Sequence, residues 1–174
     1  MDTLAQRLIS RAASQVGYKE GPNNASKYGT WAGYPNQSWC AMFVSWVFSC
    51  EHALGAIAQS SHGYINCASF RNWAHQRNLL KSVRDITPGD ILLYCWDNSE
   101  VPEHTGISAS RFDAKSHMVI AFEGNTGGNV LGSQSNGDGV YKRARPASCI
   151  VAVVSLEKAV AYWNAHNPKS EIAL

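Results

Sequence analysis

An almost unbroken run of apolar residues from Trp39 to Phe48 constrains the fold of this chain more than any other feature. The run is too long for a typical strand, and it follows three polar residues, 36–38, of the kind that begin helices. We therefore predict a helix over about 39–53. Because the helix is apolar on all sides, we expect it to be buried in the core.

The spacing of apolar residues is typical of helices in the first half of the chain and of strands in the second half. Apolar residues recur at helical spacing over 3–16, and another helix is expected near 66–78. After a turn at 88–90 the pattern is typical of strands. The expected strands are 91–96, 104–110, 117–123, 139–144 and 149–154, with a short helix at 155–166. Helices followed by an antiparallel sheet indicate an α+β domain.

The chain has 174 residues without an internal repeat or a low-complexity linker, which suits a single domain over 1–174 with a core of about 5–154. The segment 18–38 is rich in Gly, Pro and Asn and contains scattered aromatic residues. We predict a long ordered loop there, and such loops tend to be functional. Segments 97–103 and 124–138 are also expected to be loops.

Charge and hydropathy exclude several classes of protein. The formal net charge is +2 and no cluster of five or more Lys and Arg occurs, so we expect no nucleic-acid partner. No stretch of 18 apolar residues exists, so we expect no membrane insertion. The first residues lack a basic segment followed by an apolar run, so we expect synthesis in the cytoplasm without a signal peptide.

Five cysteines in irregular positions, without a C-x-x-C motif, do not indicate a disulfide framework. We expect one reactive thiol and four inert ones. Cys40 is the candidate because it lies at the predicted first turn of the buried helix. Unpaired backbone N–H groups and the helix dipole favour a thiolate there. The same N–H groups can stabilise the oxyanion that forms when a nucleophile attacks a carbonyl.

A thiolate nucleophile needs a base within hydrogen-bond reach, and the base needs an orienting partner. Of the six histidines, His104 is the preferred base because it begins a predicted strand just after a polar loop. His117 begins the next strand and is the alternative. Glu123 and Asn125 are two residues apart, so on an extended chain they point to the same face. Either can orient the imidazole while the other holds the site.

Six short motifs in this order resemble the CHAP family, the cysteine, histidine-dependent amidohydrolases/peptidases. The resemblance runs from about residue 5 to 146. The motifs are Gln15-Val16-Gly17-Tyr18-Lys19-Glu20, Lys27-Tyr28-Gly29-x-Trp31, Trp39-Cys40-Ala41-x-Phe43-Val44-x-Trp46, Pro88-Gly89-Asp90-Ile91, His104-Thr105-Gly106-Ile107 and Glu123-Gly124-Asn125-Thr126.

The resemblance implies a papain-like fold, with N-terminal helices packed on an antiparallel sheet, and bacterial peptidoglycan as the substrate. It implies that Cys40 is the nucleophile, His104 the base, Glu123 the orienting residue and Asn125 a second polar residue of the site. The reaction expected is hydrolysis of an amide bond, as in an N-acetylmuramoyl-L-alanine amidase or a peptide endopeptidase. As an alternative to packing roles, three aromatic residues are candidates for the walls of a substrate cleft: Trp31, Tyr28 and Trp39.

Such a protein is expected to be a phage endolysin, a monomer that reaches the cell wall after release through a holin. A secreted bacterial amidase toxin with the same chemistry is an alternative, as is a transglutaminase-type enzyme. A different class is a non-catalytic wall-binding module, in which Cys40 is a core residue.

We expect no metal and no cofactor. Some phage members of the family bind calcium through acidic residues before the nucleophile, but residues 21–38 contain no Asp or Glu. Calcium prefers such anionic oxygen ligands. The Cys and His residues also lack the short ligand pairs of a zinc site. Chelators are therefore expected to leave activity unchanged.

Overall fold

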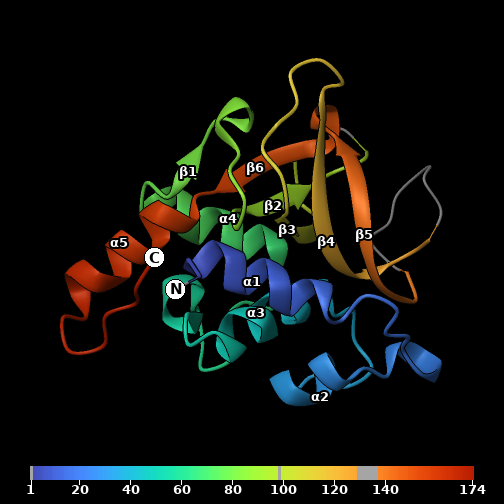
Figure 1. The fold of residues 1–174 in the computed structure, drawn as a ribbon. Helices are drawn as coiled ribbons and strands as arrows, with labels where there is room; N and C mark the ends of the chain where they lie inside the picture. Colours follow the sequence, from blue (N-terminus) through green and yellow to red (C-terminus); the bar gives the residue numbers. More distant parts are fainter. Residues whose placement is uncertain (1, 98, 129–136) are drawn as a thin grey trace.

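A computed structural model describes residues 2–97, 99–128 and 137–174, and these ranges form an α+β fold, as predicted (Figure 1). The α-helices within them are α1 (Leu4–Ala13), α2 (Lys27–Ala32), α3 (Cys40–Cys50), α4 (Cys67–Gln76) and α5 (Leu156–His166). The strands are β1 (Leu80–Lys81), β2 (Ile91–Tyr94), β3 (His104–Ser108), β4 (Met118–Thr126), β5 (Gly139–Pro146) and β6 (Ile150–Val154). They form one antiparallel sheet in the order β1-β6-β2-β3-β4-β5.

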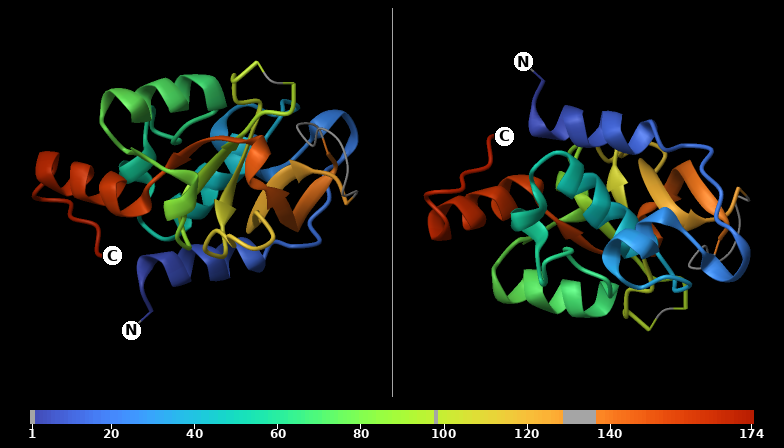
Figure 2. Two further views of the ribbon diagram at one scale, coloured as in Figure 1. Left: turned by 90° about the horizontal axis from the view of Figure 1, so that it is seen from above. Right: turned by 90° about the horizontal axis from the view of Figure 1, so that it is seen from below.

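The predicted buried helix is α3, and it is the central helix of the fold. Every residue from Cys40 to Ser45 is buried. The helix contacts β3 and β4 of the sheet, and it also contacts α1 and α2. Seen from below, α3 lies between α1 and α4 (Figure 2). Its continuous apolar surface is therefore matched by neighbours on several sides.

Both faces of the sheet are covered by apolar side chains. Along β2, Ile91 and Leu93 belong to the large core shared with the helices, whereas Leu92 and Tyr94 belong to a second, smaller apolar cluster. This alternation follows from the pleat of a strand, which directs successive side chains to opposite faces. The continuous apolar sequence of β2 thus reflects a strand that is buried on both faces.

Some predicted boundaries are wrong. The segment 18–38 is not a continuous loop, because it contains helix α2, which Ser26 caps by accepting a hydrogen bond from the Gly29 amide at 3.0 Å. The two-residue strand β1 was not predicted. The predicted loop 124–138 begins too early because β4 continues to Thr126, and its part 129–136 lies outside the described residues, as does residue 98 of the predicted loop 97–103.

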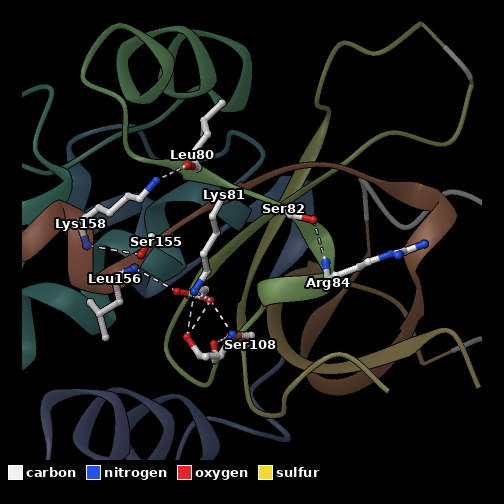
Figure 3. A network of polar contacts seen from close by, with 10 residues as sticks. Leu80, Lys81, Ser82, Arg84, Ser108, Ser155, Leu156 and Lys158 are labelled. Atoms are coloured by element: carbon white, nitrogen blue, oxygen red, sulfur yellow. Dashed lines mark hydrogen bonds and ion pairs between the residues drawn. The ribbon is translucent and has the colours of Figure 1, made fainter. Parts of the chain in front are cut away.

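The buried carboxylate of Asp90, just before β2, contacts Lys81 on β1 and Leu156 at the start of α5, two partners that Figure 3 labels. Asp90 accepts hydrogen bonds from the backbone N–H groups of Leu156 at 3.0 Å and Thr87 at 2.7 Å. It also pairs with the ammonium group of Lys81 at 2.6 Å. Asp90 therefore ties the end of the sheet away from β5 to the C-terminal helix.

Candidate active site

Cys40 is the first residue of α3, and only 5% of its surface is exposed. The residue before it, Trp39, occupies the N-cap position without making a side-chain capping hydrogen bond. The first-turn N–H groups of α3 are therefore not capped by that side chain. These groups and the positive end of the helix dipole favour a negative charge on the Cys40 sulfur.

His104 begins β3 and is completely buried. Its Nε2–H group donates a hydrogen bond to Oε2 of Glu123 at 2.9 Å. In the described part of the chain, Nδ1 of His104 has no hydrogen-bond partner. The imidazole lies close enough to the Cys40 thiol for each group to shift the pKa of the other. One side chain thus links a sulfur on α3 to a carboxylate on β4.

Glu123 is held from its other side by an arginine that the sequence did not single out. Arg145 on β5 donates from Nε to Oε1 of Glu123 at 2.8 Å and from its terminal nitrogen to Oε2 at 2.5 Å. The same terminal nitrogen lies 3.1 Å from the hydroxyl of Thr126. Both members of this ion pair are buried, with 3% of the arginine side chain exposed and none of the carboxylate.

The environment of Cys40 favours its thiolate. A hydrogen bond from the Cys67 thiol is the largest influence and lowers the pKa of Cys40 well below its usual value. Burial opposes this effect, while His104 and the backbone N–H of Ala41 lower the pKa further. In turn, the Cys40 sulfur and burial raise the pKa of Cys67 well above its usual value. These directions favour ionisation of Cys40 rather than of Cys67.

The pKa values of His104 and Glu123 are shifted in the directions that favour the charged form of each group near neutral pH. Burial alone would lower the pKa of His104, but hydrogen bonds and charges from Cys40 and Glu123 raise it to about 9. Burial alone would raise the pKa of Glu123, but Arg145 and His104 lower it to about 2. These pKa shifts favour a thiolate, an imidazolium and a carboxylate in series. This order suits nucleophilic attack followed by proton transfer.

Asn125 is also buried near the end of β4, but the chain is not extended there, as the prediction of a shared face with Glu123 assumed. Its φ is 54°, and the pairing of β4 with β5 shifts between Glu123 and Thr126. A residue in the left-handed region is not extended, so the alternation of faces does not hold there.

The three aromatic candidates for a cleft wall lie in different environments. Tyr28 and Trp39 have no exposed surface, and their rings stack with centroids 5.1 Å apart. Complete burial favours packing roles for both. Trp31 is only half-buried, and its ring meets that of His62 edge-to-face at 5.2 Å. The alternative base His117 is exposed and contacts the ring of Phe112.

Three further residues border the site, and the sequence analysis assigned none of them to it. They are Cys67 at the start of α4, Arg145 on β5 and Trp96 after β2. The Trp96 ring is half-buried, with its centroid 5.8 Å from that of His104 and 5.2 Å from the Arg145 guanidinium carbon. Cys67 had one available signal, since it is a second cysteine at a predicted helix start. No pattern distinguished Arg145.

The described residues contain no group of three or more His, Cys, Asp or Glu side chains arranged to hold a metal ion. Within the same ranges, no helix combines the length and apolar character needed to cross a membrane. No protein-family model matches this chain, and no curated protein or solved structure matches it.

Proposed function

We propose that this protein is a cysteine hydrolase that cleaves an amide bond in bacterial peptidoglycan. The observation that carries the proposal is the contact of one buried imidazole, that of His104, with the Cys40 sulfur and with the Glu123 carboxylate. A nucleophile, a base and an orienting acid in this order are the parts that acyl transfer requires.

The proposed reaction has two stages. The Cys40 thiolate attacks the carbonyl carbon of the amide, and N–H groups at the start of α3 hold the oxyanion. The imidazolium of His104 then protonates the departing amine, leaving an acyl group on the sulfur. His104 next takes a proton from water, and the resulting attack releases the acid and restores the thiolate, with His104 again protonated. Glu123 keeps the ring oriented throughout.

The choice of peptidoglycan rests on the six motifs that resemble CHAP amidohydrolases/peptidases. In that family, a papain-like fold presents a cysteine at a helix start to a histidine on the sheet. Delivery from the cytoplasm through a holin, as in a phage endolysin, is part of the same proposal. The bond cleaved is either the one between muramic acid and the peptide or one within the peptide.

The test compares two cysteines at opposite ends of α3. Cys40→Ser should lower hydrolysis of purified peptidoglycan by more than about a thousandfold, because a hydroxyl is a far weaker nucleophile at neutral pH. Cys50→Ser, at the half-buried end of the helix, should retain the wild-type rate. Turbidity gives the rate, and mass spectrometry of the fragments distinguishes free lactyl groups from new amino-acid termini.

Hydrolysis retained in Cys40→Ser would remove Cys40 as the nucleophile. If the wild type binds cell walls but releases no fragments, and Cys40→Ser binds equally well, the protein is a wall-binding module.

A further inference from the structure

We propose that Arg145 is a positioning residue of this site, which holds the Glu123 carboxylate in its charged form and in the orientation that His104 requires. The inference rests on the proposed function of Cys40 and His104. It assigns a role to a residue on β5, the strand at the edge of the sheet beyond β4.

The contact has the geometry of a clamp. Two nitrogens of the guanidinium bind the two oxygens of Glu123, at 2.8 and 2.5 Å, which fixes the plane of the carboxylate. The oxygen Oε2 that accepts from Arg145 also accepts from His104 Nε2. Rotation of the carboxylate is therefore restricted by both partners, and the imidazole is held through it.

Further contacts hold the guanidinium of Arg145 in place. The hydroxyl of Thr126, at the end of β4, accepts from the terminal nitrogen of Arg145 at 3.1 Å. The guanidinium carbon also lies 5.2 Å from the Trp96 ring centroid and 5.7 Å from the Tyr94 ring centroid. Cations stack favourably on such rings. The clamp is thus held from β2, β4 and β5.

The charges give the reason for an arginine in this place. With Cys40 and Glu123 ionised and His104 protonated, the three groups carry a net negative charge in a buried site. Burial of an uncompensated charge is costly, and the usual relief is protonation of an acid. The guanidinium of Arg145 balances the set. Without it, a proton would return to Cys40 or to Glu123. Protonation of Cys40 removes the thiolate directly, and protonation of Glu123 weakens the imidazolium that stabilises the thiolate.

The shape of the group matters as well as its charge. A lysine ammonium is a point charge that cannot bind both carboxylate oxygens in a planar fork and also reach Thr126. Arg145→Lys therefore separates the two roles, because it keeps the positive charge and removes the clamp. Arg145→Met removes both.

The test measures ionisation and hydrolysis separately. The rate of Cys40 alkylation by iodoacetamide against pH gives the thiolate midpoint without any peptidoglycan. We expect Arg145→Met to raise this midpoint by about one pH unit or more. We expect Arg145→Lys to leave it near the wild-type value. Hydrolysis of purified peptidoglycan should fall by about a hundredfold in Arg145→Lys, because the imidazole loses its fixed orientation.

The control is Arg77→Met, which removes a half-buried guanidinium that stacks on Trp73 with a separation of 4.6 Å. It should change neither the midpoint nor the hydrolysis rate. A merely structural role of Arg145 predicts a lower melting temperature with an unchanged midpoint and rate in the folded protein, which would overturn the inference.

Should Arg145→Met fail to fold, Arg145→Lys decides, and wild-type hydrolysis in that variant overturns the inference. Failure of the proposed function gives a different result, because the wild type would then release no fragments from peptidoglycan, whatever the alkylation midpoint of Cys40.

Discussion

Two glycines allow the residues of the candidate site to approach one another. A Cβ atom on Gly106 would lie 2.6 Å from Cγ of Glu123, so only a glycine lets the carboxylate cross β3 at this point. A Cβ atom on Gly124 would lie 2.6 Å from both Cβ of Phe43 and Cζ3 of Trp39. The glycines that follow His104 and Glu123 in the sequence therefore have physical roles in bringing β3, β4 and α3 together.

At the same scale, hydrolysis should follow a bell-shaped pH profile. The reactive state needs Cys40 deprotonated and His104 protonated. Because the pKa of Cys40 is lowered, the rate should rise on the acid side well below the usual thiol value of 9.0. Because the pKa of His104 is raised to about 9, the rate should fall as the pH passes through about 9. The measurement is kcat/KM on a soluble peptidoglycan fragment as a function of pH.

The variant Cys67→Ala tests the cause of the acid limb of this pH profile. It should move the acid limb to higher pH, since the Cys67 thiol is the largest influence that lowers the pKa of Cys40. Cys149→Ala removes another buried thiol and should leave the limb in place. An acid limb that does not move in Cys67→Ala would contradict the assigned hydrogen bond.

At the scale of elements, the attachment of α5 depends on Asp90. Asp90→Asn should lower the free energy of unfolding by about 3 kcal/mol, because it breaks a buried ion pair with Lys81. Urea denaturation measures the change. The exposed pair of Lys19 and Asp138 is the control, and Asp138→Asn should change stability little. The hydrolysis rate of folded Asp90→Asn should equal that of the wild type, and a large loss would link this network to the site.

The elements also show what could be predicted from the sequence. Helix α3 was predicted because a long apolar run has few alternatives, and its start was placed within one residue. Helix α2 has only six residues and contains a glycine, so it carries no readable period. The two residues of β1 are defined by pairing with β6 rather than by any local pattern.

Some residues of the candidate site could be predicted from the sequence and others could not. Cys40, His104 and Glu123 lie where elements begin or in short motifs, so chemistry and position identified them together. Arg145 alternates with Arg143 along β5, and nothing local distinguishes the two. Arg145 pairs with Val119 and Glu123 pairs with Tyr141, so the contact between Arg145 and Glu123 runs along the sheet rather than between paired residues. Tertiary packing alone determines this partner.

At the scale of the whole molecule, the buried charges make stability depend on acid. The pKa of Glu123 falls from its usual 4.5 to about 2 in the folded protein, so its charge stabilises the fold above pH 4.5. This contribution, about 3 kcal/mol, should be lost as the pH falls towards 2. Urea denaturation at several acidic pH values measures it. Glu123→Gln should show a shallower loss over the same window, and an equal loss would contradict the pKa shift.

The cluster draws its side chains from α3, β3, β4 and β5, and this order along the chain has a consequence for biosynthesis. During translation, Cys40 is added to the chain well before Arg145. Until β5 has been translated and has paired with β4, the charge balance proposed above for Arg145 cannot form. On the proposed role of Arg145, we therefore expect the Cys40 thiol to be less reactive in a nascent chain than in the folded protein.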